Sequence, residues 1–448
     1  MLAIGLCLAA FIACYLAGRR SLGQGMVAVL AFGYFYGIIR ANLLTTFSHF
    51  IFDAAVAGLY LSARWTSAGP LEKKLLKPVQ MWTLGLMAWP VLLVLMPFQP
   101  LLVSLVGLRG CIYFIPLLIL GARLTKKDLL QFSVGLAVLD LVALAFAVGE
   151  YFLGVERFFP LNAVTVIMYN SHDVAGDLLR IPSTFVNSHA YAGTMLSTMP
   201  FLIGLWIYGQ NRFFRLIAMI SIPGVLIGVL MSATRLNFVM GCGMVIFVLF
   251  RTRLKSQYRI LFLVIIAGVT IAALSNERFQ RFKTLDDADY VSDRIAGSVN
   301  RNFWEILIEY PMGNGLGGGG TSIPYFLEGQ VRNPIGMENE YARILSEQGI
   351  IGFLIWASFL IWFLWHGRAA FGNVPWGIAR KLTWCTALLA MGTGMIGTGL
   401  LTSIPETMLL MVGMGWVLVS GETQPDVPAH PMRISLKRPR RGYVPALQ

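Results

Sequence analysis

Arginine residues stand at the ends of apolar runs in the middle of this 448-residue chain. Arg180 precedes IPSTFVNSHAYAG, and Arg235 lies in SATRLNF, a short turn between two apolar runs. Arg294 and Arg301 flank IAGSVN in a longer polar stretch. A guanidinium group binds phosphate oxygens bidentately and stays charged at any working pH. Any one of these arginines alone is best explained by contacts with lipid headgroups or nearby aspartates. Arg180 and Arg235 together, both at helix ends, predict a site for a lipid pyrophosphate.

A further arginine, Arg109, lies inside the apolar run LLVSLVGLRGCIYFIPLLIL. A charge at membrane depth is costly and usually faces a partner or a cavity. Candidate partners on other apolar segments are Asp53, Asp140 and Glu150. The sequence leaves two interpretations equally open, a structural ion pair and a role in the site.

Two carboxylates and an amide precede an apolar run in GMENEYARILSEQGIIGFL, at Glu338, Asn339 and Glu340. A carboxylate at a helix start complements the helix dipole, so capping explains one of them. The same residues at a junction between a loop and the membrane also suit a general base beside an acceptor hydroxyl.

Other motifs in the chain give weaker signals. The run GNGLGGGG over 313–320 lacks the Lys-Ser/Thr that follows in a phosphate-binding P-loop, which favours a flexible or tightly turned loop. The sequence has no His, Cys and Asp cluster with the spacing of metal ligands. Of the five histidines, only His172 and His189 fall on the same predicted face of the membrane as Arg180.

The elements that must hold these residues are transmembrane helices. The composition is 56% hydrophobic with 13% charged residues, far below the roughly 25% charged residues of a soluble domain. Repeated apolar runs of about 20 residues predict an all-α polytopic membrane protein, because barrel strands are short and alternating. Thirteen segments are expected near 1–17, 24–39, 47–62, 81–97, 101–121, 132–153, 188–208, 216–232, 236–250, 260–275, 347–365, 382–399 and 404–420.

The net charge of +13 indicates topology and predicts no nucleic-acid partner. Lys and Arg gather in alternate connections and in the tail, which places those connections and the C-terminus in the cytoplasm. Thirteen helices would then place the N-terminus on the outer face, and twelve helices with a cytoplasmic N-terminus is the alternative. The expected divisions are about ten helices over 1–275 with an outer loop near 154–187, a large outer loop over 276–346, further helices over 347–420, and a basic tail over 421–448.

Three stretches resemble the O-antigen ligase and O-antigen polymerase superfamily of membrane glycosyltransferases. RIPSTFVNSHAYAGTML resembles the Arg-led motif that begins a helix in that family, and VLMSATRLNFVMG resembles its Ser-Arg turn. NRNFWEILIEYPMGNGLG, followed by NEYARILSEQGIIGFLIW, resembles its long-loop signature and the next helix. Together they cover about 180–360, whereas the earlier helices match only in being apolar.

The resemblance implies a bacterial inner-membrane enzyme with a periplasmic site. Its chemistry would be a metal-independent, inverting glycosyl transfer from an undecaprenyl-pyrophosphate-linked glycan, without a cofactor. Family arginines that engage the pyrophosphate correspond to Arg180, Arg235 and Arg301. The family has a His-Asn pair where this chain has Glu338-Asn339. We expect Glu338 to be the base; a different acceptor, an inactive member, or a base supplied by His189 or His172 are the alternatives.

The expected reaction is polymerisation of lipid-linked repeat units into O-antigen or exopolysaccharide. A ligase that transfers the glycan to lipid A core or to protein is the first alternative, and a polysaccharide or lipid transporter is the second. Expected partners are the lipid-linked donor, a glycan or lipid acceptor, membrane lipid, and a chain-length regulator or flippase. Catalytic residues are predicted at Glu338, Arg180 and Arg235, and substrate-binding residues at Arg301, Arg294, Asn339, Trp304, His189 and Arg109; Tyr310, Tyr325 and Phe326 would join Trp304 in stacking on sugars.

Overall fold

Helices make up the regular structure of the computed structural model, which describes residues 1–63, 70–169, 178–252, 255–275, 303–319, 323–336, 339–368, 376–397 and 399–419. These ranges contain no β-strand. The first half of the chain contains α1 (Leu2–Arg20), α2 (Leu22–Tyr34), α3 (Tyr36–Asn42), η1 (Thr46–Phe50), α4 (Ile51–Ala63), α5 (Pro70–Leu93), α6 (Leu101–Ile112), α7 (Leu117–Ala122), α8 (Lys126–Leu153), η2 (Val155–Arg157) and α9 (Val166–Tyr169). The second half contains α10 (Ser188–Tyr208), α11 (Arg212–Met231), α12 (Arg235–Arg251), α13 (Ser256–Ser275), α15 (Phe303–Glu309), η4 (Tyr325–Gln330), α16 (Glu340–His366), α17 (Gly377–Thr393) and α18 (Glu406–Leu418).

Six helical stretches among the described residues are long and apolar enough to cross a membrane: α1, α6 with α7, α8, α10, α11 and α16. The pair α2 and α3, bent by 40°, makes a seventh if it counts as one span. The chain is therefore an all-α, multi-pass membrane protein. Each of the thirteen predicted segments overlaps a helix or a consecutive pair. Several of these helices are too short to span a bilayer alone, so the count of twelve or thirteen spans stays a prediction.

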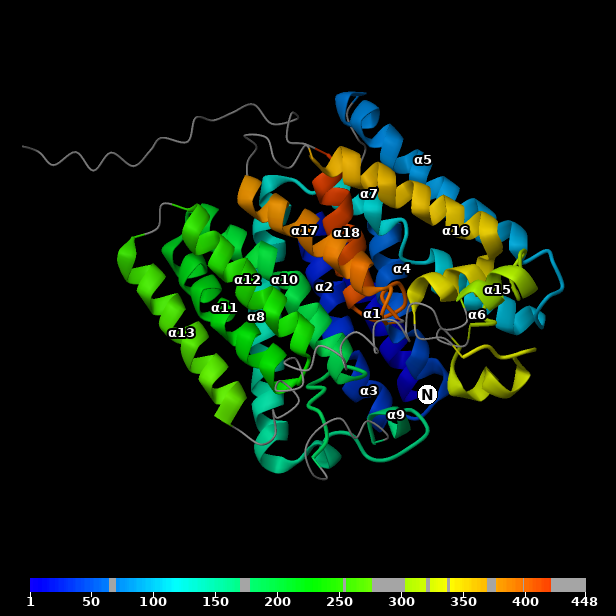
Figure 1. Cartoon of the computed structure of the whole chain (residues 1–448), viewed down its shortest axis with the longest axis horizontal. Helices are drawn as coiled ribbons and strands as arrows, with labels where there is room; N and C mark the ends of the chain where they lie inside the picture. The colour runs from blue at the N-terminus through cyan, green and yellow to red at the C-terminus, as the bar shows by residue number, and fades with distance from the viewer. Residues whose placement is uncertain are drawn as a thin grey trace, which may run out of the picture.

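Helix α10 lies at the centre of the bundle. It packs against α8, α11, α17 and α18, and 89% of its most apolar window is buried. A helix that is apolar on every side belongs in such a core. Figure 1 shows α11, α12 and α13 on one side of the molecule and α5 with α16 on the other. The start of α10 lines one cavity with residues of α3, α6 and α12, which are distant in the sequence.

The segment that leads into α10 is anchored to two earlier helices. Ile38 of α3 donates its backbone N–H to the Thr184 carbonyl at 3.0 Å. A Cβ at Gly37 would lie 2.0 Å from the carbonyl carbon of Phe185, so only glycine permits this approach. On the other side, the Ser183 N–H donates to the Glu150 carboxylate of α8 at 2.9 Å. The entry into α10 is therefore fixed in place.

Helix α16 is two helices joined at a kink, where Gly349 has φ +69°. Its first part is held by Arg343, which donates to Glu340 and to Glu347, each at 2.6 Å. All three side chains are buried. Glu340 also accepts the N–H of Gly399 at 2.7 Å. This cluster ties the start of α16 to the connection between α17 and α18.

A cationic cavity as the candidate functional site

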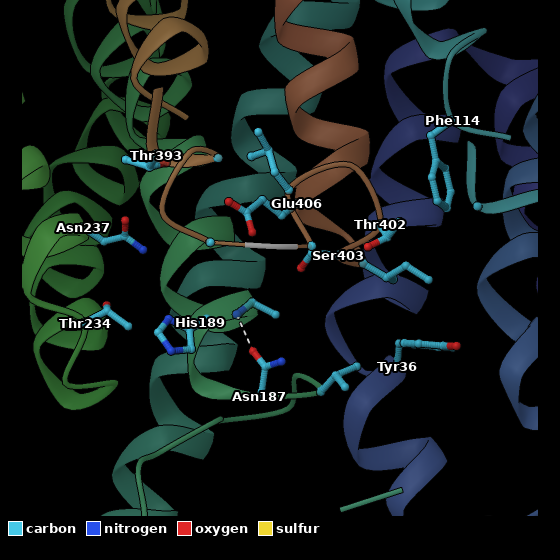
Figure 2. A pocket seen from close by; sticks show the side chains of 18 of the residues that line it. Tyr36, Phe114, Asn187, His189, Thr234, Asn237, Thr393, Thr402, Ser403 and Glu406 are labelled. Atoms are coloured by element: carbon cyan, nitrogen blue, oxygen red, sulfur yellow. Dashed lines mark hydrogen bonds between the residues drawn. The ribbon is translucent and has the colours of Figure 1, made fainter. Parts of the chain in front are cut away.

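A cavity of about 910 Å³ lies where α3, α6, α10 and α12 meet the connection between α17 and α18. Figure 2 shows side chains from α3, α10, α12 and this connection around it. The sequence places them far apart: Tyr36 belongs to α3, His189 to α10, Asn237 to α12, and Ser403 to the connection before α18. The site therefore exists only in the folded bundle.

Four arginines line this cavity: Arg40, Arg109, Arg180 and Arg235. Three of them, with His189, are among the residues that the sequence predicted for the site. Arg40, the last basic residue of α3, was not assigned a function from the sequence. Its signal was its position in a short connection that the sequence predicts on the outer face, where positive residues are uncommon. Among the described lining residues there is one carboxylate, Glu406, so this part of the wall has more basic than acidic side chains.

Arg109 is held by the Asp53 carboxylate. Its Nε and Nη2 donate to the two carboxylate oxygens at 3.0 and 2.7 Å. Of the candidate partners, Asp53 is therefore the one that the structure selects. Asp140 accepts instead from Tyr34 at 2.6 Å and from Thr198 at 2.8 Å. The ion pair neutralises most of the charge that Arg109 brings to the cavity.

Arg180 and His189 contact each other at the start of α10. The Arg180 Nη1 lies 2.8 Å from the His189 Nε2. A guanidinium has only donors, so the Nε2 lone pair must accept and the ring proton stays on Nδ1. Arg180 is buried while His189 is exposed to the cavity. The contact therefore fixes the two side chains relative to each other at the start of α10.

Arg235 is the first residue of α12, after a tight turn. In this turn Ala233 has φ +55°, and the Ser232 and Thr234 hydroxyls lie 2.8 Å apart. The turn places the Arg235 side chain at the cavity together with the first turn of the helix. The backbone N–H groups and the dipole at a helix start also favour an anion. The Arg235 charge and the backbone N–H groups at the start of α12 therefore both favour an anionic ligand.

The positive potential extends to η1, which lies outside the helices able to span a membrane. Burial and the nearby Arg40 and Arg109 guanidinium groups lower the pKa of the His49 imidazole to about 3. The ring is therefore neutral at physiological pH and packs against Tyr325 and Phe326. Arg40 itself lies over the Tyr36 ring, 5.1 Å from its centroid.

Other predicted site residues lie elsewhere. Trp304, on α15, is 62% exposed and does not line the cavity. Asn339 caps α16, since its side chain accepts the Ala342 N–H at 2.6 Å. The glycines at 313, 315 and 317 have positive φ and are buried, which is the tightly turned loop that the sequence favoured. Glu338, Arg294, Arg301 and His172 lie outside the described residues.

No family model matches this chain, and no curated protein matches it. Within the part of the chain that the structure describes, no group of three or more His, Cys, Asp and Glu residues could hold a metal ion. The geometry alone therefore defines the class: a multi-pass helical membrane protein with a cationic cavity at the ends of its helices.

Proposed function

We propose that this protein is a bacterial inner-membrane glycosyltransferase with a periplasmic site. It would polymerise undecaprenyl-pyrophosphate-linked oligosaccharide repeats into O-antigen or exopolysaccharide by inverting, metal-independent transfer. The observation that carries the proposal is the gathering of Arg40, Arg109, Arg180 and Arg235 around one cavity. These arginines come from three helices and the segment before α10, and among the described lining residues they are accompanied by one carboxylate, an arrangement that suits a ligand with several phosphate charges.

In this reaction the donor's glycosyl carbon–oxygen bond breaks and the pyrophosphate gains a negative charge. Arginine side chains aimed at that charge stabilise the transition state more than the ground state. Arg180 and Arg235 would make this contact, because they line the cavity where the chain enters α10 and α12. His189 would keep the Arg180 guanidinium in place.

The cavity also has an apolar side that suits the donor's lipid. Leu236 and Val239 of α12 line it and are 48% and 54% exposed. Exposed apolar side chains on a membrane helix contact lipid tails. A polyprenyl chain could then stay in the bilayer beside α12 while its pyrophosphate enters the cavity. The same donor would serve a ligase, so the product must distinguish the two activities.

The experiment is transfer by the purified protein in nanodiscs with a lipid-linked repeat as sole substrate. Wild type should form chains of two or more repeats on the lipid carrier. Arg235→Ala should lower the rate roughly 10²–10³-fold, as loss of one oxyanion-binding group does. Arg157→Ala, an exposed arginine of η2 outside the cavity lining, is the matched control and should keep the rate.

If the protein transfers the glycan to lipid A core but not to a second repeat, its activity is that of a ligase and not of a polymerase. A wild-type protein that forms neither product, yet carries the intact lipid-linked glycan across a bilayer, would overturn the proposal in favour of a transporter.

A further inference from the structure

We infer that Glu406 is the general base of the transfer, an inference that rests on the proposed function. The acceptor oxygen would attack the anomeric carbon of the donor. As that bond forms, the bond from carbon to the pyrophosphate oxygen breaks and its electron pair leaves with the pyrophosphate. The hydroxyl proton passes to the Glu406 carboxylate.

Glu406 has the position that this role requires. It is the first residue of α18, and its side chain lines the cavity together with Thr402 and Ser403 (Figure 2). Figure 2 places His189 on the neighbouring wall, near Glu406. Among the described residues, Glu406 is the one acidic side chain of the cavity lining.

The Glu406 carboxylate packs directly against Gly193 of α10. A Cβ at Gly193 would lie 2.3 Å from Oε1 and 2.5 Å from Oε2, so the space above this glycine is filled by the carboxylate group. Gly193 follows His189 by four residues, which places both on one face of α10 and roughly 6 Å apart along its axis. The base would therefore lie about one turn of α10 beyond the Arg180–His189 pair, toward the C-terminal end of the helix. The sugar to be transferred would then occupy the space between the base and the pyrophosphate.

The other described candidates are engaged elsewhere. The His189 Nε2 lone pair accepts from Arg180 and is not available for a proton. Asp53 holds Arg109, and Glu340 and Glu347 hold Arg343. None of the described arginines or lysines forms an ion pair with Glu406. Its carboxylate can therefore accept a proton without breaking a salt bridge.

The test compares Glu406→Gln, Glu406→Ala and Glu338→Gln in the nanodisc assay. Glu406→Gln should lower transfer roughly 10²–10⁴-fold, the usual contribution of a general base. Wild type should lose rate at acid pH as Glu406 is protonated, and Glu406→Gln should lack this loss, while binding of the lipid-linked donor stays within about twofold. Glu338, which the sequence predicted as the base, is the competing assignment: loss of transfer in Glu338→Gln together with a full rate in Glu406→Gln would return the base to Glu338.

Azide separates loss of the base from loss of the fold, because it attacks carbon without losing a proton. Glu406→Ala with sodium azide should form a glycosyl azide of inverted configuration at a rate near that of wild type with azide. Arg235→Ala should not, since the leaving pyrophosphate remains unstabilised.

Gly193→Ala provides a conservative second variant. Its new methyl group would displace the carboxylate, the mobile end of a side chain, and should lower transfer at least tenfold without a change in thermal stability. Gly243→Ala on α12, where nothing lies within 4 Å of the added Cβ, is the matched control and should keep the wild-type rate.

Transfer by wild type together with a full rate in Glu406→Gln would overturn the assignment of the base and leave the proposed function intact. A glycosyl azide product absent from Glu406→Ala but present in wild type would also overturn it. If wild type itself forms no glycosidic product, the proposed function fails first, and the inference fails with it.

Discussion

Two arrangements of arginine lie close to each other in this protein: one arginine enclosed by carboxylates, and a set of four that line a cavity. Arg343, on α16, is 1% exposed and is enclosed by Glu340 and Glu347 at 2.6 Å each. Arg40, Arg109, Arg180 and Arg235 instead line a cavity of about 910 Å³. The first guanidinium has no open volume beside it for a ligand, and the others do. Access to a cavity therefore distinguishes the arginines that we propose as substrate-binding residues from the enclosed Arg343.

Removing the charge at the enclosed site should give the largest effect on stability. Arg343→Met leaves Glu340 and Glu347 buried together without a cation, and breaking a buried pair in this way costs about 3–5 kcal/mol. We expect a markedly lower melting temperature in detergent and a poor yield. Arg235→Ala, on the cavity wall, should change the melting temperature by only a few degrees. Equal losses of stability in the two variants would remove the distinction between the two groups.

Much of this arrangement could be predicted from the sequence. Apolar runs predicted the positions of the helical segments, because a membrane span needs about 20 apolar residues. The bias against positive charge on the predicted outer face singled out Arg180 and Arg235 as candidate site residues. Glu406 could not be selected in this way. In TSIPETMLL it follows a proline and begins a helix, where a carboxylate commonly complements the dipole. Its carboxylate packs against Gly193, which lies 213 positions earlier in the sequence, and no local pattern encodes such a contact.

Arg109 stands between the two groups, because it lines the cavity and is also paired. Arg109→Ala should destabilise the protein, since Asp53 would keep its charge in a buried place. Asp53→Asn combined with Arg109→Ala should regain part of that loss, with a coupling energy of about 0.5–3 kcal/mol. The measurement is a double-mutant cycle on denaturant unfolding in detergent micelles. Additive losses would show that the pair contributes nothing to the fold.

The smallest expected effect concerns Asn339, which the sequence placed in the substrate-binding set and the structure places at the start of α16. Its side-chain oxygen accepts the Ala342 N–H at 2.6 Å, a contact that serine can replace. Asn339→Ala should therefore lower stability by about 1 kcal/mol, whereas Asn339→Ser should keep both stability and transfer rate. Thermal melts and transfer assays of the two variants separate the roles. If Asn339→Ser folds as wild type does but loses transfer, the amide nitrogen contacts substrate. Asn339 would then belong to the cavity site and not only to the enclosed cluster at the start of α16.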